Sequence, residues 1–498
     1  MKKLNTDILI TKRNEVYTKV TCEKHVAKEL SEYFTFFVPG YQFVPAYRNR
    51  IWDGKIRLFN LQTSQLYLGL IPYLIEFCDE RNYAYSHDII EDEYSVYHAQ
   101  KYFDTLNLHS QGKQIGVREH QQNAFIEAMQ KRRTLLLSPT ASGKSLIIYL
   151  LFRQLLQYQQ LKGLIIVPTT SLVEQLYSDF ADYSSENGFN VEENVHRIYQ
   201  GKDKLTDKNL TISTWQSLYK LPPEYFHQFQ YVIGDEAHLF KAQSLTSILT
   251  SCVNAKYRIG LTGTLDGTKT HKLVLEGLFG PTKKVISTKE LIDKKQLSAF
   301  NIKCLVLKHS EEVCKEMKDK SYPDELKYLI ESENRNRFIR NLAISLDKNT
   351  LVLFQMKKHG RVLYEMIKDK ANGRKVFFVD GDVETEVREE IRKIMEVEKD
   401  AIFVASFGTT STGTNIRNLH NIIFTSPSKS RVRNLQSIGR GLRQNEGKDM
   451  ATLYDISDDL RIKKHTNFTL QHFIERVKIY NEEKFPFKIY NIGLKNGH

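Results

Sequence analysis

The sequence lacks the features that mark secreted and membrane proteins. None of its five cysteines belongs to a Cys-x-x-Cys pair or a histidine cluster: Cys22, Cys78, Cys252, Cys304 and Cys314. This spacing speaks against a disulfide framework and against a zinc site. No apolar run is long enough to span a bilayer, and the lysine-rich start lacks the apolar segment of a secretory signal. We expect reduced thiols, a cytoplasmic location and no membrane partner.

Acidic charge is scarce relative to basic charge. The chain has 72 lysines and arginines against 59 aspartates and glutamates, which gives a net charge of +13. A positive excess draws a protein to phosphate polyanions and speeds its encounters with them. Because solvated surface lysines produce the same excess, the charge indicates a nucleic-acid partner without establishing one.

Internal repeats and low-complexity tracts are absent, and two series of short apolar strands alternate with amphipathic helices. Such alternation predicts parallel sheets that carry a ligand at the carboxyl ends of their strands. The expected strands of the first series are 134–138, 163–168, 210–214, 231–236 and 258–264. Those of the second are 350–355, 375–380, 401–406, 421–426 and 451–457. We predict an α/β fold of two tandem parallel-sheet lobes behind a small α+β domain.

The same patterns divide the 498 residues into five segments, a length that accommodates about three domains. An N-terminal nucleic-acid-binding module precedes two lobes joined by a linker. The last segment is expected to be a helix followed by an aromatic, basic coil. The module covers residues 1–110, the first lobe 111–285, the linker 286–300, the second lobe 301–463 and the last segment 464–498.

A loop typical of phosphate binding follows the first expected strand and precedes an apolar helical run. It consists of Ser138, Pro139, Thr140, Ala141, Ser142, Gly143, Lys144 and Ser145. Backbone N–H groups at a helix N-terminus form an anion site, and Gly143 lets phosphates approach the backbone closely. Lys144 can reach the β- and γ-phosphates, and the Ser145 hydroxyl can ligate Mg²⁺. The usual pattern begins with glycine, and the small Ser138 takes that place.

A pair of carboxylates ends another expected strand. Asp235 and Glu236 close the run Tyr-Val-Ile-Gly-Asp-Glu, and His238 follows them. We expect the pair beside the phosphate loop, on the strand next to it. Asp235 would hold Mg²⁺ through its water shell, Glu236 would be the general base for the attacking water, and His238 would couple the site to the next segment. An acidic surface turn would not explain the apolar strand and the matching phosphate loop.

The phosphate loop and the Asp-Glu-Ala-His run resemble the superfamily-two helicases of the DEAH type. The remaining motifs follow in order over residues from about 115 to 460. The resemblance implies RecA-like lobes, an adenine-reading segment with Arg118 and Gln121, and a coupling motif at Thr262, Gly263 and Thr264. It also implies residues that contact the nucleic-acid strand: Pro168, Thr169, Thr214, Gln216 and Thr412.

The sixth motif of that family resembles residues 436–443, where Gln436 joins the nucleotide site and the arginine fingers carry over to Arg440 and Arg443. A planar guanidinium on a facing lobe can stabilise charge that develops on the γ-phosphate. Since it does so only when the lobes close, hydrolysis becomes linked to movement.

The resemblance extends through the front of the chain to recombination helicases of this superfamily. It implies an ATP-dependent DNA helicase or translocase with ATP and Mg²⁺ as cofactors and 3′-to-5′ polarity. The implied substrates are single-stranded DNA and branched DNA, namely forks, four-way junctions and R-loops. The implied processes are fork regression, Holliday-junction branch migration and R-loop unwinding in recombination, repair and replication restart. A single-strand-binding protein is an expected partner.

The front segment contains an expected β-hairpin over residues 47–59. Asp-Gly at 53–54 is a strong two-residue turn signal. With that turn, strand alternation puts six side chains on one face: Arg48, Arg50, Trp52, Lys55, Arg57 and Phe59. Cations beside aromatic rings suit phosphate contact and base stacking, so we expect this face to grip duplex DNA at a branch. A solvated outer face of a sheet is the alternative.

Three other functions stay open at this point. The same motor motifs serve a duplex translocase that does not separate strands, and they do not choose between DNA and RNA. A nucleic-acid-annealing protein with a degenerate ATP site is the non-enzymatic alternative. The intact set Lys144, Asp235, Glu236, Arg440 and Arg443 argues against that last possibility.

Overall fold

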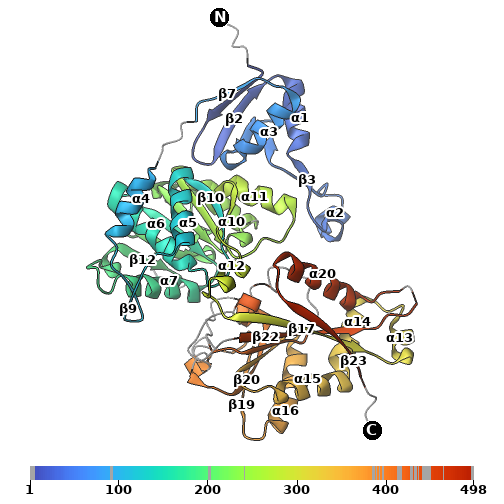
Figure 1. The fold of residues 1–498 in the computed structure, drawn as a ribbon. Helices are drawn as coiled ribbons and strands as arrows, with labels where there is room; N and C mark the ends of the chain where they lie inside the picture. The colour runs from blue at the N-terminus through green and yellow to red at the C-terminus, as the bar shows by residue number, and fades with distance from the viewer. Residues whose placement is uncertain are drawn as a thin grey trace, which may run out of the picture. The chain divides into compact units, whose positions relative to one another are not determined.

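The computed structural model of the chain forms two compact units. One consists of residues up to Val285, leaving aside Pro139–Ser142, and the other of residues from Ile286 (Figure 1). The described residues are 6–89, 94–199, 203–240, 242–383, 387, 390–391, 393–394, 397–411, 418–426, 430, 435, 437–439, 450–463 and 465–494. Within these ranges no helix has both the length and the apolar character needed to cross a membrane.

The front module is a small α+β domain, as the sequence predicts. Its five-stranded sheet has the order β5-β6-β2-β1-β7 and is antiparallel apart from the β1–β7 pair. Ile8, Ile10 and Val20 of this sheet are buried in one apolar cluster with Leu30 and Leu74 of the helices. The elements are β1 Ile8–Lys12, β2 Tyr17–Cys22, α1 Lys24–Tyr33, β5 Phe59–Asn60, β6 Gln65–Tyr67, α3 Ile71–Arg81 and β7 Tyr85–His87.

The expected hairpin over 47–59 is wrong. A short helix, α2 (Pro45–Arg48), takes the place of its first strand, and β4 (Lys55–Arg57) pairs instead with β3 (Thr35–Phe37). Pro45 favours a helix start because its φ is fixed and it has no N–H to give a strand partner. Arg50 then adopts φ 57°, in the left-handed region, so the chain bends where the hairpin needed extended backbone.

The rest of the first unit is lobe 1, a seven-stranded parallel sheet in the order β12-β13-β11-β14-β15-β10-β16. All five strands expected from the sequence are present to within two residues, whereas the short β12, which is half polar, and the short β16, which is wholly polar, were missed. The strands are β10 Arg133–Leu137, β11 Gly163–Val167, β12 Val195–Ile198, β13 Leu210–Thr214, β14 Tyr231–Asp235, β15 Tyr257–Thr262 and β16 Thr282–Lys284. The principal helices are α5 Glu119–Lys131, α6 Lys144–Gln159, α7 Thr170–Tyr183, α10 Gln243–Ser251 and α11 Lys269–Phe279.

The order of these strands corrects the expectation that the acidic pair and the phosphate loop follow adjacent strands. β15 lies between β14 and β10, and it pairs in parallel with both. β11 follows β10 in the sequence but lies three positions away from it in the sheet, and the later strands β14 and β15 lie between them. Long crossovers of this kind are normal for parallel sheets, and strand spacing in the sequence does not reveal them.

The second unit contains lobe 2, another seven-stranded parallel sheet, in the order β19-β20-β18-β21-β22-β17-β23. Its five expected strands are present to within two residues, and β17 and β23 were missed. The strands are β17 Ala299–Lys308, β18 Thr350–Phe354, β19 Lys375–Val379, β20 Ala401–Ser406, β21 Asn421–Phe424, β22 Met450–Asp459 and β23 Phe487–Gly493. Its helices include α12 Thr288–Asp293, α14 Tyr322–Glu331, α15 Glu333–Ser345, α16 Lys357–Lys370 and α20 Phe468–Glu482.

The expected coil at the end of the chain is in fact β23, which pairs in parallel with β17 from Phe487 opposite Ile302 onwards. The preceding helix, α20, is fixed by buried polar contacts with β22. Arg476 Nε donates to the Asp455 carboxylate at 2.9 Å, and the Tyr480 hydroxyl donates to the same oxygen at 2.8 Å. This buried ion pair orients α20 so that the chain returns to the sheet edge.

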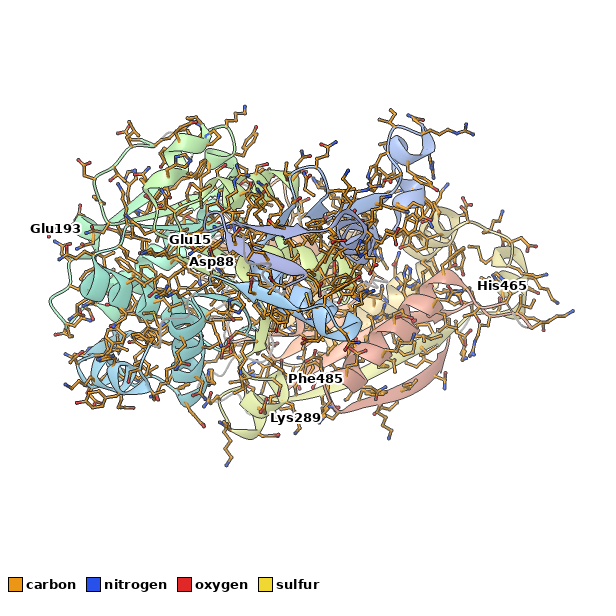
Figure 2. All side chains as sticks on the ribbon, turned by 90° about the horizontal axis from the view of Figure 1, so that it is seen from above. Glu15, Asp88, Glu193, Lys289, His465 and Phe485 are labelled. Atoms are coloured by element: carbon orange, nitrogen blue, oxygen red, sulfur yellow. The ribbon has the colours of Figure 1, made fainter. Side chains whose placement is uncertain are left out.

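The front module is fastened to lobe 1 by buried polar contacts. Glu15, labelled in Figure 2, accepts from Arg133 of β10 at 2.6 Å, and both side chains are 13% exposed. Burial lowers the pKa of Arg133 to about 10, still far above neutral pH, so this ion pair keeps its charge. The Glu276 carboxylate of α11, 2% exposed, accepts from the Tyr73 hydroxyl of α3 at 2.5 Å. These contacts make the module and lobe 1 a single packed body.

Candidate active site

The phosphate loop follows β10 and ends at the first turn of α6. The Ser138 N–H donates to the Thr262 carbonyl at 2.8 Å, which joins the start of the loop to the end of β15. Within the loop, the Ser142 hydroxyl donates to the Pro139 carbonyl at 2.7 Å, and Ala141 adopts a left-handed φ of 65°. This closed turn directs the chain into the N-terminus of α6, where unpaired N–H groups attract anions.

Gly143, the N-cap of α6, is needed for both its conformation and its lack of a side chain. Its φ of 86° lies in the left-handed region, and an added Cβ would lie 2.2 Å from Gln121 Nε2. Gln121 is buried, and its Oε1 accepts from the Arg118 N–H at 2.9 Å. The structure therefore brings the expected adenine-reading segment directly against the phosphate loop.

Asp235 lies at the end of β14 and is 7% exposed. Burial, and after it the charge of Glu236, raise the pKa of its carboxyl to about 6 against the opposing effect of the Lys144 ammonium. The Lys144 Nζ itself donates to the Ser138 carbonyl at 3.3 Å. A carboxylate this poorly solvated gains more from a bound cation than an exposed one, which suits a metal-binding role.

Glu236 and His238 connect the acidic motif to the coupling motif. Glu236 has φ 50°, an uncommon value for a residue with a side chain, and its N–H donates to Asp235 Oδ1 at 2.9 Å. His238 Nδ1 lies 3.0 Å from Thr262 Oγ1 and 3.4 Å from the Glu236 carboxylate. Because the Thr262 hydroxyl donates to the Thr264 carbonyl at 3.0 Å, its oxygen is left to accept, and we assign the proton of His238 to Nδ1.

The residues expected to hold Mg²⁺ fit that role by chemistry. Ser145 is in the first turn of α6, and its hydroxyl is 3.0 Å from the Tyr183 hydroxyl at the end of α7. A serine hydroxyl and a buried carboxylate are both oxygen ligands of the kind this ion takes. Sequence reasoning missed Tyr183, because only the packing of α7 on α6 brings its hydroxyl to the loop.

The four strand-contacting residues expected in lobe 1 come together at the ends of two adjacent strands. Val167 of β11 lies opposite Thr214 of β13, so Pro168 and Thr169 follow at the same sheet edge. Gln216 Nε2 donates to the Pro168 carbonyl at 3.4 Å, and the Thr169 hydroxyl caps α7 by accepting from the Leu172 N–H. Thr412, Gln436, Arg440 and Arg443 lie outside the described residues.

Comparison with known proteins identifies the family of the chain. Three family models match: DNA helicase UvsW, N-terminal, over residues 7–88; Type III restriction enzyme, res subunit, over 114–267; and Helicase conserved C-terminal domain, over 333–445. Over 504 aligned residues the chain is 33% identical to the ATP-dependent DNA helicase uvsW of Enterobacteria phage T4, an alignment that covers 98% of this chain and all of that protein. The chain belongs to the UvsW family of ATP-dependent DNA helicases.

Solved structures agree with membership of the UvsW family. A crystal structure of T4 UvsW matches 98% of this chain and all of its own length, with a TM-score of 0.53 and 31% identity. A crystal structure of the UvsW helicase from Bacteriophage T4 matches 56% of this chain and 99% of its own length, with a TM-score of 0.52 and 33% identity. The resemblance to superfamily-two helicases is thereby confirmed, as are the two RecA-like lobes and the use of ATP.

Replacing Gly143 by alanine should weaken nucleotide binding about tenfold to a hundredfold, because a left-handed φ and contact with Gln121 both oppose a Cβ. Equilibrium titration with a fluorescent ATP analogue measures the effect. Gly188→Ala is the matched control, since Gly188 has φ 73° but no atom within 4 Å of an added Cβ. Equal nucleotide affinity of Gly143→Ala and Gly188→Ala would contradict the assignment of the phosphate loop as the nucleotide-binding site.

Replacing Asp235 by asparagine should stabilise the nucleotide-free protein above pH 6 and have little effect below pH 3.8. Between these values the folded protein keeps a proton that the unfolded chain has released, so the free energy of unfolding falls as the pH rises. The gain above the window is at most about 3 kcal/mol. Denaturant unfolding without Mg²⁺ measures it, with Asp207→Asn at an exposed position as the control. A loss of stability in Asp235→Asn above pH 6 would contradict the claim that the buried carboxylate destabilises the folded protein.

Proposed function

We propose that this UvsW-family helicase uses ATP hydrolysis to remodel branched DNA. Forks, four-way junctions and R-loops are its proposed substrates, and translocation with 3′-to-5′ polarity its proposed mode. The observation that supports the proposal is the attachment of the front module, with its basic, aromatic segment at residues 37–57, to the lobe that holds the phosphate loop. DNA bound to the module and ATP bound to the loop would then both contact the same packed unit of the protein.

In the proposed reaction, each side chain of lobe 1 has a separate task. Lys144 binds the β- and γ-phosphates, and Glu236 accepts the proton of the water that attacks the γ-phosphate. Ser145 and Asp235 would hold Mg²⁺, which supplies positive charge beside the phosphates. His238 and Thr262 link Glu236 to the coupling motif, so a change at the γ-phosphate alters the end of β15.

The two arginines of the sixth motif complete the proposed cycle. Their position in the sequence of a family member supports a role for Arg440 and Arg443 as guanidinium partners of the γ-phosphate. Loss of that phosphate removes their partner, and the resulting change in lobe closure would drive one step along the nucleic acid. Pro168, Thr169, Thr214, Gln216 and Thr412 are the proposed contacts with the strand.

The front module carries the proposed specificity for branches. Between residues 37 and 57 the chain has four cations, Arg48, Arg50, Lys55 and Arg57, and a single carboxylate, Asp53. Lys55 Nζ lies 4.9 Å from the centre of the Phe37 ring, and the three arginines line one pocket with Trp52. Four of the six residues expected on one face thus line a common pocket on a different backbone, whereas the prediction for Phe59 is wrong because its side chain is buried in the core. A single-strand-binding protein is the proposed partner on the displaced strand.

Lys144→Ala and Glu236→Gln should each lower DNA-stimulated ATP hydrolysis at least about a hundredfold. They should differ in nucleotide affinity, because Lys144→Ala removes a phosphate contact and Glu236→Gln removes only the base. Steady-state ATPase assays and nucleotide titrations separate the two effects. Residual turnover near the wild-type rate in Glu236→Gln would refute its role as the general base.

Reversing two charges, Arg50→Glu with Arg57→Glu, should weaken fork binding by about tenfold to a hundredfold at moderate salt and flatten its salt dependence. The matched control is Lys24→Glu with Lys28→Glu, which makes the same charge change on exposed positions of α1 in the same module. Fluorescence anisotropy with forked DNA measures both. If the Arg50→Glu, Arg57→Glu variant bound forks as tightly as the control variant, the proposal that these residues recognise branches would be wrong.

A further inference from the structure

An open pocket of about 820 Å³ lies in the front module, in the segment that connects β3 to β4. Its lining residues are Gln42, Tyr47, Arg48, Arg50, Ile51, Trp52, Asp53 and Arg57. Pockets that take small organic ligands measure about 300–1,000 Å³ and combine apolar walls with a few polar groups. The size and the lining therefore suit a ligand with a flat apolar part and a charged part.

Two cations of this pocket form no ion pair within the part of the chain that the structure describes. Arg57 is paired with the Asp53 carboxylate, whereas no carboxylate in the described part of the chain lies within ion-pair distance of Arg48 or Arg50. Arg48 Nε donates to the Gln42 carbonyl at 3.2 Å, which directs this side chain along the pocket. Guanidinium groups without a carboxylate partner favour an anionic ligand, and their planar donors match phosphate oxygens.

The aromatic wall is held in place before any ligand binds. Trp52 Nε1 donates to the Lys55 carbonyl at 2.9 Å, so the indole edge is fixed while Ile51 beside it is 80% exposed. Tyr47 packs edge-on against Tyr41 with ring centres 4.7 Å apart. Aromatic side chains that are fixed and partly open provide stacking surface at a small entropic cost.

The pocket is also anchored to lobe 1. Tyr41 stacks on Phe37 at 4.7 Å, and Gly54, whose added Cβ would lie 2.5 Å from the Tyr41 ring, allows that ring to sit close to the backbone. The Phe37 carbonyl accepts from the Thr270 hydroxyl of α11 at 3.3 Å. A ligand in this pocket is consequently held by the same body that carries the phosphate loop.

We propose that this pocket binds one unpaired nucleotide at the branch point of DNA. The base lies against Tyr47 and Trp52, and the adjoining phosphates contact Arg48 and Arg50. This inference rests on the proposed function, in which the front module binds branched DNA. A base inside a duplex must be unpaired and unstacked before it can enter a pocket, and that cost is smallest where pairing is already broken. A branch point supplies such a base, whereas a continuous duplex does not.

The first test changes only the DNA. Two forks are prepared that are identical except that the unpaired residue at the branch carries a base in one and is abasic in the other. Wild-type protein should bind the fork with the base about tenfold more tightly, since stacking of one base on aromatic side chains is lost in the other. Equal affinities would overturn the inference. A fluorescent adenine analogue at the same position should be quenched on binding, and unchanged emission would count equally against it.

The second test changes the protein. Trp52→Ala should bring the ratio of the two affinities close to one, because the principal stacking surface is gone. The matched control is Tyr97→Ala, which removes an aromatic ring that is 63% exposed on α4 (Val96–Asp104) and should keep the wild-type ratio. A wild-type ratio in a folded Trp52→Ala protein would assign the base preference to another site and refute the pocket.

The two proposals fail in different ways. If Arg50→Glu with Arg57→Glu binds forks as tightly as wild type, branch binding by the front module is wrong. A second outcome is that the charge-reversal variant binds forks weakly, while wild type binds the base-containing and abasic forks with equal affinity. In that case the module binds branched DNA through its charges alone. Only the nucleotide pocket is then refuted.

Discussion

The end of β15 is the point on which the candidate active site of lobe 1 depends. Thr262 accepts from the Ser138 N–H through its carbonyl and lies 3.0 Å from His238 through its hydroxyl. One residue therefore contacts the phosphate loop on one side and the acidic motif on the other. Because β15 pairs with both β10 and β14, a shift of its end moves both groups together. This position gives a physical basis for the coupling attributed to the Thr-Gly-Thr motif.

Charge is concentrated at the proposed cation site of lobe 1. Asp235 is buried close to Glu236, and together these carboxylates raise the cost of leaving the site empty. Lys144 is the compensating cation of the phosphate loop. This arrangement, which is unfavourable without ligands, would become favourable if the proposed metal–phosphate complex supplied the missing charges. The loss of stability at Asp235 would then be linked to the affinity of the proposed site for its cation.

The front module is part of the same body. Its ion pair between Glu15 and Arg133 reaches β10, the strand that carries the phosphate loop. Its contacts with Glu276 and Thr270 reach α11, which follows the coupling motif. Buried polar contacts of this kind are lost at high cost, so the module is expected to move with lobe 1 during each cycle of hydrolysis.

The sequence by itself determined ten of the fourteen lobe strands, the candidate site loops and the family, because apolar runs bounded by glycine and polar residues are local signals. The phosphate loop and the acidic motif were predictable for the same reason, whereas the contact of Tyr183 with Ser145 was not. Tertiary structure alone decided that β15 lies between β14 and β10, that the tail adds β23 to the second sheet, and that β4 pairs with β3. The Asp-Gly turn predicted the wrong strand pair, because long-range packing determines which strands pair. The helix that starts at Pro45 and the left-handed backbone of Arg50 prevent the residues before the turn from forming a strand.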